Sequence, residues 1–597
     1  MKNRSVPFFL RALLVGLAIA GLSACAGTRE LVAPLTPGEP EPEIVLEGVD
    51  GALEDNVRAH LALTQEPCDA PLWRVRQRFA RADQDIATGL RAFGYYHPRV
   101  EKDLEEIEGC WRAVFRIEPG EPVRVTAVDV RIRGEAGEDP AFRTLLEKLP
   151  VREGEQLNHG EYEKAKQAIA NLAAERGYFD GRFTIGRLAV DPGQNRAQVD
   201  LEYDSGPRYR FGPIRLHQEV LRPALVERFV RIEPGEAYEG ARLAALNAAL
   251  IDSGYFSRVD IRPRVQEAED TRVPVDVELT PRRRHRFSTG LGAATDTGLR
   301  ASAGYGNRRL NRRGHRFSLG GEISFITVDL GAEYQIPLSD PRTEWLTLRT
   351  SFQAENSDTL DTEILQASVS RTQIRFGEWL ETEYVEFSRE DFEVGEDEDI
   401  VSLVTPGLSW ARTEADDPGH PRRGWRARVE IQGTDQVLGS DTAFAQFRAA
   451  GKWIRALPWD GRVLLRGDFG ATATEDFSRL PGSKRFYAGG DNSVRGFGYR
   501  DLGPEDEAGD VVGGRFLLVG SFEYEHPITE RWAVAAFIDA GNALKNLKGL
   551  DLDDLETGAG GGIRWRSPIG SVRLYIASPI TDPDRSVRVH FIMGPDL

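Results

Sequence analysis

The chain has 597 residues, a formal net charge of −18 and a mean hydropathy of −0.40. This length is too great for one domain and indicates several. Outside the N-terminus no stretch of eighteen uncharged apolar residues occurs, which excludes helical membrane spans but not the alternating strands of a transmembrane barrel. The acidic balance also argues against a nucleic-acid partner, because phosphate binding needs positively charged faces.

Residues 1–26 have the features of an export signal. A basic N-terminus precedes an apolar run that is too short to span a membrane and ends in small residues. Two processing sites compete: Leu22–Cys25 resembles a lipoprotein box, which would place a lipid on Cys25, whereas Ala24–Ala26 fits an ordinary peptidase site. Both predict that the protein leaves the cytoplasm. Residues 27–43 then form a proline-rich, acidic linker.

Two cysteines follow the signal, Cys68 and Cys110. An even number of cysteines in an oxidising compartment favours a disulfide over a metal site. The sequence therefore predicts a Cys68–Cys110 bridge within the first folded domain.

A weak internal repeat covers residues 44–121, 122–208 and 209–281. Its marker is a glycine and two aromatic residues after an amphipathic helix: Gly94–Tyr96, Gly177–Phe179 and Gly254–Phe256. The glycine is expected to cap the helix and the aromatic residues to enter the core. The order of elements, a strand, two helices and two strands, predicts three small α+β domains. Free strand edges in such domains can accept an extended peptide by β-augmentation.

From His285 onward the chain alternates between apolar and polar residues, in sixteen segments. Such alternation is typical of a transmembrane barrel, with its apolar face toward lipid and its charged face toward a wet lumen. An even number of strands closes an antiparallel barrel with both ends in the periplasm. If the first strand rises from the periplasm, the even-numbered connections are short periplasmic turns and the odd-numbered ones are extracellular.

One long connection, between the eleventh and twelfth segments, contains RFYAGGDNSVRGFGYRDLGP at 485–504. A long connection inside a compact fold is usually functional. The next two segments carry Glu523 and Asp539, and their alternation places both carboxylates on the lumen face, where Arg495 can reach them. Arginine suits this role, because its planar fork holds two carboxylate oxygens and keeps its charge.

The loop, F-E-Y at 522–524 and F-I-D-A-G at 537–541, in this order, resemble three motifs of the outer-membrane-protein assembly superfamily, and the wording of the loop is most similar to its TamA branch. The resemblance covers essentially the whole mature chain. It implies three periplasmic α+β POTRA domains followed by a 16-stranded antiparallel transmembrane β-barrel at 285–597. The loop motif Arg495, Gly496 and Phe497 would then fold back into the lumen, anchored by Glu523 and Asp539.

The resemblance also implies a function and partners. Such a protein helps to insert other barrel proteins, notably autotransporters, into the outer membrane. The expected partners are unfolded barrel clients, outer-membrane lipid and an inner-membrane-anchored TamB-like protein contacted by the POTRA domains. A two-partner-secretion pore for one exoprotein is the alternative. Those pores usually have two POTRA domains behind a plug helix, and residues 33–43 are too rich in proline for such a helix.

The final segment ends in Gly594–Pro595, which cannot complete a regular ladder with the first segment. This predicts either a simple strand terminator or a weak seam between 287–291 and 587–591, and the resemblance favours the seam as a lateral gate. The residues assigned to this gate are Phe287, Leu291, Val589, Phe591 and Gly594.

Catalytic chemistry is not expected. The sequence has no G-x-S-x-G elbow, no H-E-x-x-H motif and no cysteine pair at zinc spacing. The glycine-rich stretch 558–562 leads into strand residues and not into a helix, so it is not a phosphate loop. We therefore expect no enzyme activity, no cofactor and no metal.

Overall fold

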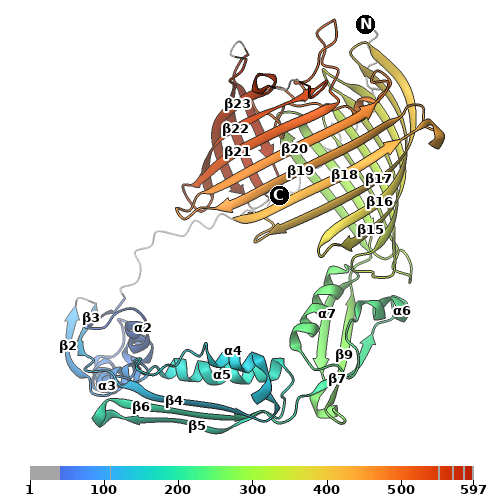
Figure 1. Ribbon diagram of the computed structural model, residues 1–597. Helices are drawn as coiled ribbons and strands as arrows, with labels where there is room; N and C mark the ends of the chain where they lie inside the picture. Colours follow the sequence, from blue (N-terminus) through green and yellow to red (C-terminus); the bar gives the residue numbers. More distant parts are fainter. Residues whose placement is uncertain (1–40, 108, 549–550, 568–569, 583–584, 595–597) are drawn as a thin grey trace. The chain divides into compact units, whose positions relative to one another are not determined.

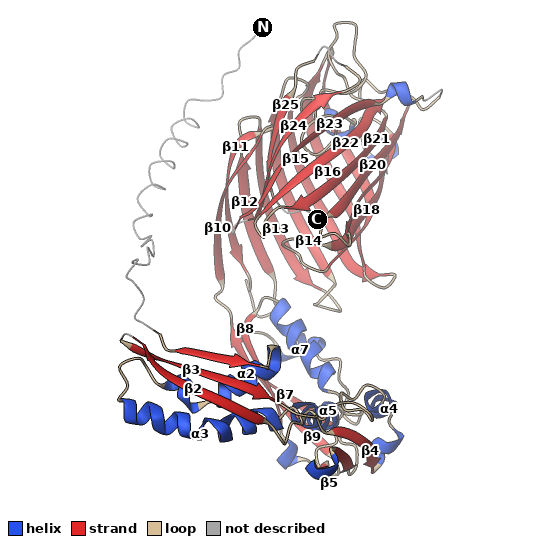
Figure 2. Cartoon of the chain, turned by 90° about the vertical axis from the view of Figure 1, so that its left-hand side faces the viewer, coloured by secondary structure: helices blue, strands red, loops and turns tan. Residues whose placement is uncertain are grey.

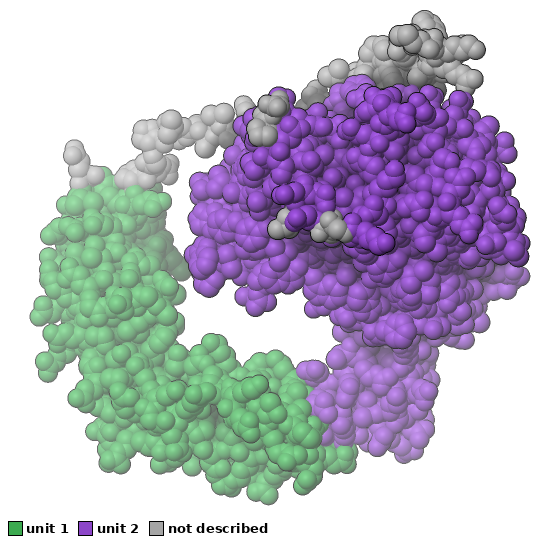
Figure 3. Space-filling model, turned by 45° about the horizontal axis from the view of Figure 1, so that its top comes forward, with its two compact units in different colours: residues 1–174, 180–207 green, residues 175–179, 208–597 purple. Residues whose placement is uncertain are grey.

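The computed structural model describes residues 41–594, apart from residues 108, 549–550, 568–569 and 583–584. The expected export signal, Cys25 and residues 27–40 lie outside this part. The chain divides into two compact units, one with the first two repeats and one with the third repeat and the barrel (Figure 3). No helix in the described part is long and apolar enough to cross a membrane.

All three repeats are small α+β domains in which helices cover one face of a three-stranded sheet (Figure 1). The first consists of β1 (Glu43–Glu47), α2 (Gly51–His60), α3 (Leu72–Arg91), β2 (Arg99–Ile107) and β3 (Cys110–Glu118). The second consists of β4 (Arg124–Arg133), α4 (Pro140–Leu146), α5 (His159–Glu175), β5 (Arg182–Asp191) and β6 (Arg196–Asp204). The third consists of β7 (Arg210–His217), α6 (Pro223–Val226), α7 (Gly240–Asp252), β8 (Phe256–Pro263) and β9 (Arg272–Pro281). In each sheet the last strand is central, parallel to the first strand and antiparallel to the middle one.

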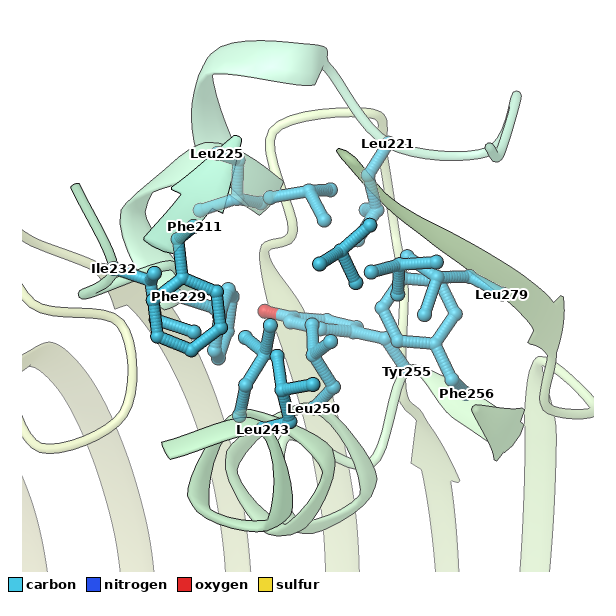
Figure 4. Packing of buried hydrophobic residues seen from close by; sticks show 14 of the residues in the cluster. Phe211, Leu221, Leu225, Phe229, Ile232, Leu243, Leu250, Tyr255, Phe256 and Leu279 are labelled. Carbon is cyan, nitrogen blue, oxygen red and sulfur yellow. The ribbon is translucent and has the colours of Figure 1, made fainter. Parts of the chain in front are cut away.

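The repeat marker does what its residue types predict in the third repeat. Gly254 has φ +70° at the end of α7, and Tyr255 and Phe256 lie in the core, 1% and 0% exposed. Figure 4 shows the Tyr255 ring above Leu243 and Leu250 of α7, and the Phe256 ring beside Leu279. The first repeat departs from the expectation, because Tyr96 is only half-buried and its hydroxyl instead meets His159 of the second repeat at 2.9 Å.

Cys68 and Cys110 are joined by a disulfide that spans 42 positions of the chain and packs against the core of the first repeat. Replacing both with serine is expected to lower the free energy of unfolding of this repeat by about 4 kcal/mol, because the bridge restricts the unfolded chain. Pulse proteolysis of the full-length protein across a denaturant series measures this loss. An unchanged unfolding midpoint for residues 43–119 would contradict it.

The rest of the second unit is a closed barrel of sixteen antiparallel strands, which confirms the expected fold class (Figure 2). Its first eight strands are β10 (His285–Ala294), β11 (Gly298–Asn307), β12 (Arg316–Ile323), β13 (Thr327–Pro337), β14 (Trp345–Asn356), β15 (Asp361–Arg375), β16 (Trp379–Val394) and β17 (Asp397–Ala415). The remaining eight are β18 (Arg423–Thr434), β19 (Phe444–Ala456), β20 (Arg462–Thr474), β21 (Phe516–Pro527), β22 (Trp532–Leu544), β23 (Glu556–Ser567), β24 (Gly570–Pro579) and β25 (Arg588–Met593).

The third repeat contacts the turns at the base of the barrel. The Tyr255 hydroxyl donates to the carbonyl of Gly314, in the turn between β11 and β12. The guanidinium of Arg316 lies 4.8 Å from the Tyr255 ring and 4.2 Å from the ring of Trp345 at the start of β14. The same aromatic residue therefore serves the core of the third repeat and its contact with the barrel.

The seam joins β10 to β25 through one ladder pair among the described residues, Ala294 with Ile592. Two hydrogen bonds continue this contact: Thr295 N–H donates to the carbonyl of Phe591 at 3.2 Å, and Phe591 N–H donates to Thr295 Oγ1 at 2.9 Å. The seam lies between the two strands that the sequence assigned to it, and the ladder between them is confined to the end of β10. The reason is that β25 is only six residues long, so it reaches only the end of β10.

Candidate functional site: the anchored lumen loop and the seam

The connection between β20 and β21 runs from residue 475 to 515, longer than the motif seen in the sequence. Three short bridges shape it: Phe486 with Gly514, Ala488 with Leu502 and Glu505 with Val511. Phe497 is 1% exposed and belongs to a small apolar cluster built by the loop and the barrel wall: Phe486, Ala488, Val494, Phe497, Leu502, Leu517, Val519 and Ala543. The loop is therefore packed into the barrel and held by its own core.

Arg495 lies between the two predicted carboxylates. Its Nε and Nη2 donate to the two oxygens of Asp539 at 2.7 and 2.8 Å, and its Nη1 donates to Glu523 at 2.8 Å. The backbone N–H of Arg495 also donates to Asp539 at 3.1 Å. This is the bidentate arrangement that an arginine fork allows and a lysine does not.

The environment of Arg495 is dry, which differs from the wet lumen expected from the sequence. Arg495 is 4% exposed, Glu523 6% and Asp539 0%. The guanidinium carbon also lies 3.4 Å from the centre of the Phe537 ring and 5.0 Å from that of Tyr575. Because the loop itself excludes water here, the charges are screened far less than they would be in an open channel.

A second layer of charges holds the acidic partners. Arg564 on β23 hydrogen-bonds Glu523 and meets Glu525 at 3.0 Å, while Arg462 meets Glu525 at 2.7 Å. Tyr575 donates its hydroxyl proton to Glu523 at 2.7 Å. Sequence analysis missed these residues, although the alternation of β23 and β24 could have placed Arg564 and Tyr575 on the lumen face.

Two further arginines fasten the ends of the loop. Arg485 pairs with Asp397 at 2.9 Å and donates to three backbone carbonyls of the loop. Arg500 pairs with Glu355 of β14 at 2.9 Å. The loop is thus attached to several strands of the barrel wall, and Arg495 is one of several residues that anchor it.

Two glycines let the loop lie against the wall. A Cβ on Gly558 of β23 would stand 1.8 Å from the carbonyl oxygen of Arg495, so only glycine fits there. Gly496 has φ +103°, a region open to glycine. The glycine-rich stretch 558–562, which the sequence only showed not to be a phosphate loop, therefore provides the surface on which the motif packs.

The loop also reaches the seam. Asp491 accepts hydrogen bonds from Thr295 Oγ1 at 2.8 Å and from His590 Nδ1 at 2.6 Å, and its own N–H donates to Asp296 at 2.6 Å. Burial raises the pKa of Asp296 to about 6, and the charge of Asp491 adds to this effect. We call Asp491, Thr295, Asp296 and His590 the seam latch, because they join the β10–β11 turn to β25 through the loop.

The seam latch is not suited to a metal, although Asp296, Asp491 and His590 bring three potential ligand atoms within 4.8 Å of one another. The N–H of Gly496 donates to Nε2 of His590 at 2.9 Å. The ring proton must then sit on Nδ1, where it is donated to Asp491. Neither ring nitrogen keeps a lone pair for a cation.

The residues assigned to the gate lie on either side of the seam and do not pair with one another across it. Phe287 and Leu291 on β10 are 77% and 86% exposed, and Val589 on β25 is 54% exposed. Phe591 contacts Thr295, and Gly594 N–H donates to the carbonyl of Ser571 on β24. Their part in gating stays a prediction, since the structure shows one closed arrangement.

A closed antiparallel barrel preceded by α+β repeats, with an arginine-anchored loop in its lumen, defines a class of outer-membrane protein. The Omp85 superfamily domain matches residues 286–596, and POTRA domains match all three repeats. The matching descriptions are "POTRA domain TamA domain 1" at 43–119 and "Surface antigen variable number repeat" at 123–206 and 209–282. The chain belongs to the Omp85 superfamily, whose members act in outer-membrane protein assembly and secretion.

Known relatives agree with this assignment. The outer membrane protein assembly factor BamA of Neisseria meningitidis serogroup B is 23% identical over 591 residues, which cover 87% of this chain and 73% of the relative. BamA of Neorickettsia risticii is 23% identical over 564 residues, 88% of this chain and 74% of the relative. The crystal structure of Haemophilus ducreyi BamA lacking POTRA domains 1–3 has the same fold, with a TM-score of 0.65 at 17% identity over 78% of this chain and 99% of that one. The barrel therefore lies in the outer membrane and its POTRA domains lie in the periplasm.

Proposed function

We propose that this chain is a TamA-like assembly factor that promotes the insertion of other β-barrel proteins, such as autotransporters, into the outer membrane. The observation that carries the proposal is the free edge of β10. Residues 285–293 have no partner on β25 among the described residues, so their backbone groups on that side offer hydrogen bonds to another strand. An unpaired edge is a template for strand addition, and it demands little of the incoming sequence.

Two further observations support the TamA branch and its partners. The first repeat matches the family model described as the first POTRA domain of TamA, and the two repeats that follow match POTRA domains as well. Unfolded barrel clients and outer-membrane lipid are the partners that an edge at a membrane seam would meet. A TamB-like protein anchored in the inner membrane is the proposed partner of the POTRA repeats.

The anchored loop weighs against a dedicated secretion pore. Arg495 and Phe497 are buried inside the barrel, and Arg495 is attached to its wall through Asp539. A client polypeptide would have to displace this dry ion network to pass through. Pairing at the seam leaves the network in place, and it therefore fits the structure better.

The proposal is tested by reconstitution of the purified protein in phospholipid vesicles. Denatured autotransporter barrels are added, and folding is followed by protease resistance of the barrel. We expect several unrelated barrels to fold faster than in vesicles without the protein. In cells, loss of the protein should deplete several outer-membrane barrels together. Loss of one exoprotein, with all barrels at normal levels, would instead identify a two-partner-secretion pore.

A further inference from the structure

An arginine cluster lies at the periplasmic ends of β10, β11 and β12, in a protein whose overall charge is −18. It comprises Arg282–Arg284 before β10, Arg308 and Arg309 after β11, and Arg312 and Arg313 in the turn to β12. The pairing of β10 with β11 brings Arg282–Arg284 close to Arg308 and Arg309, since Arg308 N–H donates to the carbonyl of Arg284 at 2.9 Å. We call these residues the rim arginines.

The rim arginines have no carboxylate partners. None of them forms an ion pair with a described residue, and the side chains of Arg284 and Arg308 donate hydrogen bonds to neutral oxygens, such as Asn307 Oδ1 for Arg284. Nη1 of Arg309 is buried without any hydrogen-bond partner. Several arginines elsewhere in the barrel pair with acids, as Arg448 does with Asp468 at 2.7 Å. Unpaired cations gathered in one place indicate that the counter-charge comes from outside the chain.

The cluster also contains a recess of suitable size. An open pocket of about 400 Å³ is lined by Arg222, Asn311, Arg312 and Arg313. Its far side is fixed by the third repeat, because Arg222 N–H donates to the carbonyl of Arg312 at 2.8 Å. Three guanidinium groups around one opening can contact the oxygens of a single phosphate.

The position of the cluster specifies the source of that phosphate. Phe287 and Tyr305 are paired residues of β10 and β11 with ring centres 5.4 Å apart, and Phe287 is 77% exposed on the lipid-facing side. Aromatic residues of barrel walls mark the level of the lipid headgroups. The rim arginines follow directly on the periplasmic side of these rings, where the phosphates of the inner leaflet lie.

We propose that the rim arginines bind the phosphate headgroup of an anionic phospholipid in the periplasmic leaflet, beside the β10 side of the seam. The bound lipid neutralises the cluster, and its acyl chains run along the exposed apolar face of β10. In the isolated chain the neighbouring arginines repel one another, and this lack of counter-charge agrees with an anionic ligand at the site. Burial and the nearby Arg282, Arg286 and Arg316 lower the pKa of Arg308, and burial and Arg284 lower that of Arg309.

The test measures lipid selection by the full-length protein in uncharged detergent micelles that contain equal amounts of phosphatidylglycerol and phosphatidylcholine. Native mass spectrometry counts the lipids that remain bound. We expect the wild-type protein to retain phosphatidylglycerol. Arg312→Gln/Arg313→Gln, at two exposed turn positions, should reduce this preference about thirty-fold, since each arginine near an anionic surface contributes about a five-fold factor. Arg308→Gln/Arg309→Gln should do the same.

The matched control is Arg422→Gln/Arg423→Gln, in a periplasmic turn where Arg422 lies 3.5 Å from Asp460 and the backbone N–H of Arg423 binds Asp416. Its lipid preference should equal that of the wild type. An equal loss of lipid preference in the control would show that net charge alone causes the effect, and would overturn the site. An unchanged lipid preference in both rim variants would also overturn it. A third arm adds inorganic phosphate at millimolar concentration: displacement of the lipid by free phosphate would show an anion site that does not select lipid, and would overturn the proposed occupant.

Discussion

Arg495→Glu is expected to give a barrel that inserts but loses its compact form at a much lower temperature. Removing one partner of a buried ion pair costs about 3–5 kcal/mol. The reversal is worse than a removal, because three carboxylates would then share a site in which Asp539 and Glu523 are almost fully buried. We therefore expect a loss at the upper end of this range, measured as the midpoint of thermal unfolding in detergent.

Companion variants separate charge, shape and pairing. Arg495→Lys keeps the charge but loses the two-pronged contact with Asp539, and should be intermediate. Arg495→Glu combined with Asp539→Arg should recover part of the stability. The matched control is Arg448→Glu, which breaks a half-exposed pair with Asp468 and should cost less than about 1 kcal/mol. Additive behaviour of the double variant, within about 0.5 kcal/mol, would show that Arg495 and Asp539 are not energetically coupled.

Locking the seam is expected to stop assembly while leaving the barrel intact. Ala294 and Ile592 are the paired residues of β10 and β25, so cysteines at both positions are suitably placed for a crosslink. If clients pair with the β10 edge, the crosslinked protein should fold no added barrels in the vesicle assay, and a reductant should restore activity.

The control for this experiment uses the same residue types one hairpin away. Ala301 on β11 and Ile323 on β12 are the end pair of a ladder that continues without a break to Asn307 and Phe317, so a crosslink there adds no constraint to the seam. The wild-type protein treated with the same reductant accounts for loss of the Cys68–Cys110 bridge. Full client folding by protein whose Ala294–Ile592 crosslink is complete would remove seam opening from the mechanism.

Alternation along each strand was enough to predict that Glu523 and Asp539 face Arg495, because the side of a strand is a local property. Contacts that depend on the closure of the whole barrel could not be predicted in the same way. His590 and Asp296 are far apart in the chain, and they meet only because β25 returns beside β10. The register at the seam could not be predicted for a related reason, since it depends on the offsets accumulated over all the strands between β10 and β25.

The glycines show a second limit of sequence reasoning. The stretch 558–562 is visible in the sequence, but its purpose depends on which backbone lies above it. Gly558 is required by the carbonyl of Arg495, and that contact exists only when the loop is folded inside. A run of small residues on a lumen-facing strand, in a barrel with one long loop, is the signal that could have indicated it.

The position of the one ladder pair also gives the seam a direction. Ala294 is the last residue of β10, at the extracellular end, and the seam latch reinforces that end, while the periplasmic part of β10 has no partner on β25 among the described residues. Strands held at one end separate as a wedge, widest where they are free. Under the proposed function, a strand arriving from the periplasm meets the wide end first and can add its hydrogen bonds one by one toward the narrow end. The costly step, release of Ala294 and Asp491, then comes last, after the new pairs have formed.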